Sequence, residues 1–410
     1  METRAARPVF WPEIRALLLA AMAVFTYTIT IGILNGTDAV EFDQRRILGH
    51  VHGGTLGWLT LSVFAASLWL FGEGKPVSQR ERMFARWLAA GAVAAFVAYV
   101  VAFSLTYGNW RPILGTVSTT VIAGQFLWVL SRARGMELGV PHWGFLAALG
   151  TSIVGGVLGI LWGLQLATGD QYLPTDGEGA HPAMMVVGFL VPVGLAMSEW
   201  AFFFPPPPKA ERLGIIQMAF PFVGGILLML SLLLDVVPLA PIAILLQIIG
   251  FAIFVKRMWP QFRRVDLTAP SPGRHAIMAA VGLLFVIGLA QYLVIKHKGD
   301  LDLAPMHHLL ALDHSQFIGL MTNSIFAMLM AATIGQRGNR LDQVIFAAVN
   351  IGIVGFAAGL LFDAQPLKHL FTPIMGLGLY LGLAVYALRL LEIQVAGVLD
   401  RPATQGAAGK

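Results

Sequence analysis

Histidines stand near the starts of three predicted membrane spans that are four spans apart, and they are the residues of this sequence best suited to bind a metal. In the second, sixth and tenth spans they are His50 and His52, then His181, then His307, His308 and His314. An imidazole in hydrocarbon is costly unless a partner binds it. Histidines that face each other across a helical bundle are a usual way to hold a haem iron. The spacing therefore favours a site to which distant spans each contribute a ligand.

The composition is that of a membrane protein with little room for a soluble domain. Of the 410 residues, 57% are hydrophobic and 12% are charged, and the mean hydropathy is +0.74, whereas soluble domains are about 25% charged. We predict an all-α polytopic protein in which residues 1–410 form one transmembrane domain in contact with the lipid bilayer. The absence of cysteine excludes disulfides, iron–sulfur clusters and covalently attached haem. The net charge of +5 does not indicate nucleic acid, because nearly all the basic residues sit in short loops.

Apolar runs divide the chain into about twelve predicted membrane helices. They lie near 16–34, 49–72, 87–107, 112–131, 143–166, 181–204, 213–234, 239–255, 276–295, 306–334, 343–362 and 370–390. Of the 27 basic residues, 21 fall on the side of the membrane that holds both termini. The positive-inside rule places that side in the cytoplasm. We expect the protein in the inner (plasma) membrane of the cell. The six histidines then form one layer near the outer ends of their helices.

A faint internal repeat accompanies the histidines. His52 and His314 are each followed, five residues later, by a glycine and then an apolar residue, whereas His181 is two residues further from the matching Gly188. Three units of about 130 residues, roughly 1–135, 136–270 and 271–410, would give this pattern.

This arrangement resembles subunit I of the haem–copper oxidase superfamily, which includes cytochrome c oxidases, the cbb3 type and nitric oxide reductases. The resemblance implies three four-helix arcs, haem b, and a cytochrome c or another redox subunit as a partner. His52 and its apolar run resemble the helix 2 ligand of the low-spin haem, although residues 49–58 also resemble the helix 10 His-x-His of the cbb3 type. His181-Pro182 and Gly188-Phe189 resemble the helix 6 segment that supplies a copper ligand.

The sequence departs from that family at its binuclear centre. The seventh span, 213–234, has no histidine where the family carries the His-His pair for copper. Leu312 stands where the helix 10 motif has the high-spin haem ligand, and Met185 stands where many oxidases have tyrosine. The resemblance then implies one low-spin bis-histidine haem b, with copper not expected.

Specific residues carry this hypothesis. His52 and His314 are the predicted axial pair, and Gly53, Gly54 and Gly57 would let a flat macrocycle lie close to the helix. Asp313 would orient a ligand or carry a proton, or else pair with Arg111. The remaining candidates are Arg45 and Arg46, as partners of haem propionates or a solvated loop pair; His50, His307 and His308, as a shallower copper or haem ligand set or interfacial residues; and His181, as a copper ligand or a structural or proton-handling residue. His142, His275, His297 and His369 are expected at the surface.

Three functions remain open at this point. The first is a membrane haem b protein for electron transfer or for redox or gas sensing. The second is an active terminal oxidase or nitric oxide reductase subunit whose ligands have moved to His50, His307 and His308. The third is a haem-free proton or metal transporter in which Asp313, Asn323 and His314 line the path. The twelve-helix haem proteins linked to nitric oxide stress are a less favoured relative, because their Phe-Arg-Pro-Phe-Phe opening is missing here.

Overall fold

Twelve long apolar helices make up the computed structural model, which describes residues 7–106, 108–203, 209–297, 303–333 and 340–392. The α-helices are α1 (Trp11–Gly36), α2 (Gln44–His52), α3 (Leu61–Gly72), α4 (Gln79–Leu105), α5 (Trp110–Ala133), α6 (Val140–Thr168), α7 (Ala180–Ala183), α8 (Val191–Phe202), α9 (Arg212–Leu233), α10 (Leu239–Phe262), α11 (Pro272–Lys296), α12 (Met306–His314), α13 (Asn323–Ala332), α14 (Arg340–Leu361) and α15 (Gln365–Leu390). No β-strand occurs among these residues. The predicted all-α polytopic fold and its twelve spans are confirmed. Charged residues of the topology argument at positions 4, 298, 300, 302, 337, 401 and 410 lie outside the described ranges.

Several helices extend beyond one end of the apolar run that predicted them. α4 begins eight residues before the predicted start, at Gln79, because Ser78 and Glu81 form a reciprocal capping box there. α10 continues through Lys256 and Arg257 to Phe262, past the predicted end at 255. Hydropathy marks only the stretch that suits the hydrocarbon core, whereas charged residues prolong a helix into the headgroup region.

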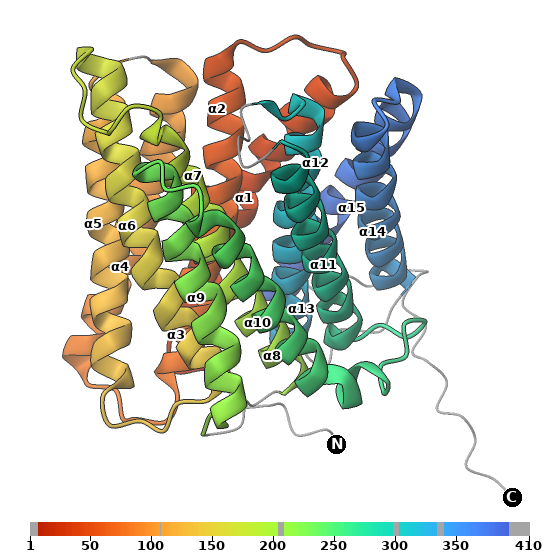
Figure 1. The fold of residues 1–410 in the computed structure, drawn as a ribbon. Coiled ribbons are helices and arrows are strands. Elements are labelled where there is room, and N and C mark those ends of the chain that lie inside the picture. Colours follow the sequence, from red (N-terminus) through yellow and green to blue (C-terminus); the bar gives the residue numbers. More distant parts are fainter. Residues whose placement is uncertain (1–6, 107, 204–208, 298–302, 334–339, 393–410) are drawn as a thin grey trace, which may run out of the picture.

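Spans 2, 6 and 10 form the centre of the bundle. Each consists of two α-helices that continue into each other through a short π-helical segment: α2 with α3, α7 with α8, and α12 with α13. In their most apolar windows, 89%, 67% and 89% of the residues are buried, against at most 50% in any other described span. In Figure 1, α2, α7 and α12 all lie toward the upper end of the bundle, which we call the histidine end. The histidines therefore begin the three helices that have the least contact with lipid.

A π-helical segment interrupts each of these three spans. The segments are Gly53–Thr60, Met184–Leu190 and Ser315–Thr322, and their first residues are 131 positions apart in both intervals. Two threonine hydroxyls bond with the five-residue spacing of a π turn. Thr60 donates to the Thr55 carbonyl, and Thr322 donates to the Phe317 carbonyl. Single π turns inside α-helices occur frequently at functional sites. The sequence analysis did not predict them.

Each π segment has a glycine as its fifth residue, and these glycines let a neighbouring helix approach. A Cβ on Gly57 would lie 2.2 Å from the Val24 side chain of α1. At the matching Gly188, the backbone lies so close that a Cβ on Gly225 of α9 would come within 2.5 Å. Gly319 is approached in the same way by α11. The faint His-to-glycine repeat therefore reflects a shared packing position within the three π segments.

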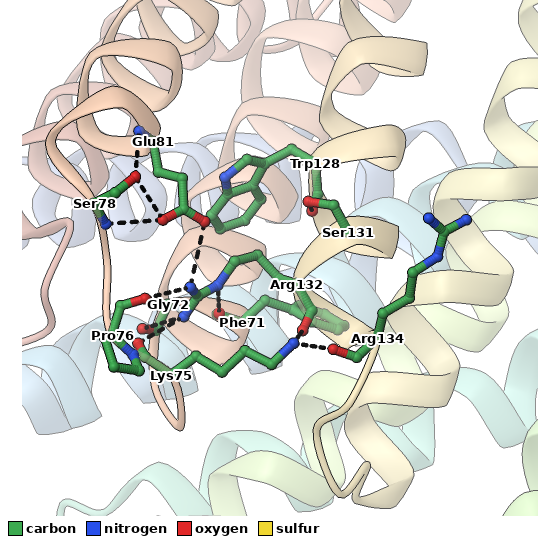
Figure 2. Close-up of polar contacts among 10 residues, drawn as sticks. All are labelled: Phe71, Gly72, Lys75, Pro76, Ser78, Glu81, Trp128, Ser131, Arg132 and Arg134. Atoms are coloured by element: carbon green, nitrogen blue, oxygen red, sulfur yellow. Dashed lines mark hydrogen bonds and ion pairs between the residues drawn. The ribbon is translucent and has the colours of Figure 1, made fainter.

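Arg132 belongs to the last turn of α5, at the end of the bundle opposite the histidine end (Figure 1), and Figure 2 shows its contacts. Its guanidinium donates to the carbonyls of Phe71, Gly72, Lys75 and Pro76 at 2.9–3.1 Å and lies 3.5 Å from the Glu81 carboxylate. The last carbonyls of a helix have no partner within the helix. Arg132 supplies that partner for the end of α3, and the side chain is only 3% exposed. Lys75 in turn donates to the carbonyls of Arg132 and Arg134. This cluster has a structural role.

Candidate functional site

A cavity opens near the histidine end, between α1, span 2, span 10, α14 and α15. Its volume is about 270 Å³, close to the roughly 300 Å³ at which small-molecule sites begin. Most of the lining is apolar and comes from Phe25, Ile29, Trp58, Leu310, Phe317, Phe356 and Leu379, among others. His50, Asp313 and His314 are polar residues within it, and Asp38 and Lys368 also border it. The cavity therefore combines an apolar interior with convergent histidines.

His50 and His314 face each other in this cavity. Their ring centroids are 6.5 Å apart, with an angle of 31° between the ring planes. The two residues come from spans 2 and 10, more than 260 positions apart in the sequence. The pair that shares a cavity is therefore His50 with His314, in place of the predicted pair of His52 with His314.

Both imidazoles hold their Nδ1 proton on a backbone carbonyl. Nδ1 of His50 lies 2.8 Å from the Thr28 oxygen on α1, and Nδ1 of His314 lies 2.8 Å from the Leu310 oxygen one turn earlier. A carbonyl can only accept, so each Nδ1 carries the hydrogen and each Nε2 carries the lone pair. A backbone carbonyl on the other ring nitrogen is the usual support for a metal-ligating histidine.

Glycines shape the walls around His50. Gly32 lies one turn after Thr28, and a Cβ there would meet Cε1 of the His50 ring at 3.2 Å. Gly54 and Gly376 also line the cavity. The predicted Gly53 and Gly57 instead lie against α1, where a Cβ on Gly53 would come within 2.5 Å of the Thr28 hydroxyl. Of the three predicted glycines, only Gly54 therefore borders the cavity, together with Gly32 and Gly376, which were not predicted.

His52 points to another face of span 2. Its ring stacks on Phe103 of α4 at 3.9 Å between centroids and meets Tyr99 edge-on at 5.4 Å. Residues two apart on a helix point in nearly opposite directions. His50 and His52 therefore serve two different interfaces of the same span.

Of the charged residues predicted around the site, Asp313 lines the cavity, whereas Arg45, Arg46 and Arg111 are not among its lining residues. Arg45 pairs with Asp43 at 2.7 Å, and the backbone amide of Arg46 caps the same carboxylate. These contacts, the Arg46 amide first, lower the pKa of Asp43. The described contacts of Arg111 are with Phe103, whereas Asp313 borders the cavity.

Lys368 of α15 is a cation at the cavity that the sequence analysis did not single out. Its Nζ lies 3.5 Å from the Asp38 carboxylate, which also accepts a hydrogen bond of 2.7 Å from Nε2 of His369. This hydrogen bond, supported by Lys368, lowers the pKa of Asp38. Lys368 is recognised as part of the site only in the folded structure, where it lines the cavity beside Asp38.

His307 and His308 do not join His50. Their rings lie edge-on to each other at 4.5 Å, and Nε2 of His308 contacts the Leu361 carbonyl at 3.3 Å. Within the described ranges, no three residues of the His, Asp and Glu types are grouped as a metal site requires. His181 donates from Nδ1 to the Gly155 carbonyl of α6 at 2.7 Å.

Two histidines expected at the surface are buried at the opposite end of the bundle. His275 has no exposed surface and contacts the Asn323 side-chain oxygen through Nδ1 at 2.9 Å. His142 is 6% exposed, and its Nδ1 accepts from the Gly139 amide at the start of α6. Both histidines lie near the polar end of a span. A hydropathy profile cannot tell there whether a side chain contacts lipid headgroups or a neighbouring helix. Asn323 is thereby committed to a buried network and does not border the cavity with Asp313 and His314.

The comparisons with known proteins give no relative that could assign this site. No protein-family model matches the chain, and no curated protein matches its sequence. The site is therefore interpreted from its geometry.

Proposed function

We propose that this protein binds haem b between His50 and His314 and works in electron transfer or in redox or gas sensing. The observation that carries the proposal is the facing pair of imidazoles in an apolar cavity. Metal–imidazole bonds are about 2.0–2.1 Å long, so two rings on opposite sides of one metal have centroids roughly 6.4 Å apart. The centroids of His50 and His314 are 6.5 Å apart. The spacing of the two rings therefore matches that of two imidazoles that would hold one iron between them.

The number of ligands also favours a macrocycle. Zinc and copper sites need about three or four protein ligands, and the described residues offer no such group. Two histidines satisfy a metal whose other four positions belong to a porphyrin. Bound there, haem b would supply one-electron redox chemistry.

The protein's own residues hold that arrangement and limit its chemistry. The carbonyls of Thr28 and Leu310 accept from the two Nδ1 atoms, and this leaves each Nε2 as the atom that could bind a metal. Lys368 at the mouth offers a cation to a propionate. If His50 and His314 both held the iron, they would leave no free position on it for oxygen or nitric oxide. The pair would therefore suit electron transfer or redox sensing better than terminal oxidase activity.

We further propose that the chain has the architecture of haem–copper oxidase subunit I. It would then have three four-helix arcs, both termini in the cytoplasm and an inner-membrane location. The three π segments at intervals of 131 residues and the central position of spans 2, 6 and 10 support this proposal. The excess of basic residues on one side supports the orientation. A cytochrome c or another redox subunit would be the partner.

Absorption spectroscopy of the purified protein tests the proposed ligand pair. We expect the sharp α band of low-spin haem b after reduction with dithionite, and loss of the His50–His314 haem in both His50→Ala and His314→Ala. His307→Ala is the matched control, because His307 belongs to the same span end but does not border the cavity. A protein without a Soret band would contradict the proposal and favour a transporter. A high-spin component that binds carbon monoxide, with copper equal to iron, would favour an oxidase.

A further inference from the structure

Several features of the His50–His314 pair recur at His52 of span 2 and His181 of span 6. We propose that His52 and His181 are the ligands of a second bis-histidine haem. This inference rests on the proposed haem chemistry, but it uses neither His50 nor His314. The argument starts from the positions of the histidines relative to the π segments.

The three π segments give a common frame in which the histidines occupy two positions. His52 and His314 each stand immediately before a π segment, whose first residues are Gly53 and Ser315. His50 and His181 each stand three residues before the first π residue, which is Met184 in the sixth span. We call the residue immediately before a π segment the first position and the residue three before it the second position. The His50–His314 cavity therefore joins a first-position histidine, His314, to a second-position histidine, His50. His52 and His181 are the other such pair.

The hydrogen bonds repeat with the positions. His52, like His314, holds Nδ1 on the carbonyl four residues earlier, here Leu48 at 2.8 Å. His181, like His50, holds Nδ1 on a carbonyl of the preceding membrane helix, here Gly155 at 2.7 Å. In all four residues the proton is therefore on Nδ1 and the lone pair is on Nε2.

The space beside the ring is repeated as well. Gly32 follows Thr28, whose carbonyl accepts from His50, by four residues, and Gly159 follows Gly155, whose carbonyl accepts from His181, by the same four. A Cβ on Gly32 would lie 3.2 Å from Cε1 of His50, and a Cβ on Gly159 would lie 2.7 Å from Cε1 of His181. Each glycine is therefore needed for the ring that its helix holds.

The surroundings of the second pair suit the same ligand. An aromatic ring of the next helix covers each first-position histidine: Phe356 contacts His314, and Phe103 contacts His52. His52 and His181 are close enough to interact electrostatically, and Arg111 is a third group in that range. With no three-residue metal group in the described part of the chain, two histidines again fit a porphyrin-bound metal.

The remaining pair of positions, in spans 6 and 10, carries no histidine. The residue immediately before the π segment of span 6 is Ala183, and the residue three before that of span 10 is Leu312. Neither side chain can bind a metal. The frame therefore predicts two sites and no third.

Haem stoichiometry on the full-length purified protein tests the second site. We expect two haems per chain, falling to one in His52→Ala and in His181→Ala, and to none in the double variant His50→Ala/His181→Ala. The haem that remains in His181→Ala should keep the low-spin spectrum of the His50–His314 site. One haem per chain that is unchanged in His52→Ala and His181→Ala would overturn the second site and leave the proposed function intact. No haem in the wild type would overturn both.

Two further variants keep the test informative if the alanine variants do not fold. His181→Met retains a ligand, so the stoichiometry should hold while half of the bis-histidine near-infrared and electron paramagnetic resonance signal changes to the histidine–methionine form. Gly159→Ala should disturb half of the signal, whereas Gly91→Ala, whose added Cβ meets nothing within 4 Å, should leave it unchanged. A His181→Met spectrum identical to the wild type would overturn the proposal.

Discussion

At the scale of single residues, the partner of Nδ1 decides which histidines can bind a metal. His50, His52, His181 and His314 all hold Nδ1 on a backbone carbonyl, and this leaves Nε2 as the ligand atom. His142 has the opposite arrangement, because its Nδ1 accepts from a backbone amide at a helix start. Its role is therefore to cap α6.

Asp313 is the carboxyl closest in sequence to the proposed axial ligand His314, and it borders the same cavity. A negative charge stabilises the oxidised iron, so Asp313→Asn should raise the midpoint potential above neutral pH. For a separation of roughly 10 Å and an effective dielectric constant of about 20, the interaction is about 1–2 kcal/mol. This corresponds to roughly 40–90 mV for one electron. A redox titration would measure it.

Asp43→Asn is the control for that titration, since Asp43 is exposed and paired with Arg45 outside the cavity. Its potential should stay within about 10 mV of the wild type, because solvent screens exposed charges. Equal shifts in both variants would contradict a local effect of Asp313.

At the scale of elements, polar side chains that end a helix or join two helices hold the bundle at the end opposite the histidines. Arg132 binds the carbonyls that follow α3 (Figure 2), and Arg389 of α15 pairs with Asp342 of α14 at 2.8 and 3.0 Å. Both sites are buried, so the loss of one partner leaves a polar group without water to replace it.

Arg132→Gln should destabilise the protein by about 3 kcal/mol, because several buried carbonyls lose a charged donor. Arg134→Gln should change the stability by less than about 0.5 kcal/mol, since Arg134 is exposed and only its backbone carbonyl accepts from Lys75. Unfolding in detergent, followed by circular dichroism, would compare the two. Equal losses would show that the Arg132 contacts contribute nothing specific.

Asp342→Asn should cost about 3–5 kcal/mol, because it leaves the Arg389 guanidinium buried beside a neutral group. Asp342 is 0% and Arg389 2% exposed in this ion pair. The double variant Asp342→Leu/Arg389→Met should recover most of the loss, since it removes both charges from the interior. The same unfolding measurement applies, and a double variant less stable than Asp342→Asn would contradict the argument.

At the scale of the whole molecule, three buried spans surrounded by nine others place every proposed ligand at one end of the bundle. Spans 2, 6 and 10 each begin at the histidine end (Figure 1). The distribution of basic residues predicts that this end faces outward. An electron donor outside the cytoplasm would then approach the proposed haems most closely.

Single cysteines test this orientation, because the chain has none of its own. Asp170→Cys lies in an exposed loop at the histidine end and should react with a membrane-impermeant maleimide on intact cells. Glu137→Cys lies in an exposed loop at the other end and should react only after the membrane is opened. The unmodified chain should not react. The reverse pattern would show that the termini face outward.

The sequence determined the properties that depend on local composition. Twelve apolar runs of membrane-spanning length predicted twelve helices, because hydrocarbon requires each span to satisfy its own backbone. The recurrence of histidine in spans 2, 6 and 10 likewise identified the region of the site. The sequence also showed that His181 is two residues further from its glycine than His52 and His314 are from theirs. It did not show that His181 thereby occupies the same place before its π segment as His50.

Only the tertiary structure decided which histidines face each other. His50 and His52 are separated by one residue, so the rotation of span 2 determines which of them meets His314. That rotation depends on the π segments and on glycine contacts such as Gly57 with Val24, which join residues far apart in the chain. Hydropathy and spacing contain no term for such contacts. For that reason the sequence indicated a site at these helix ends, whereas packing selected His50 as the histidine that faces His314.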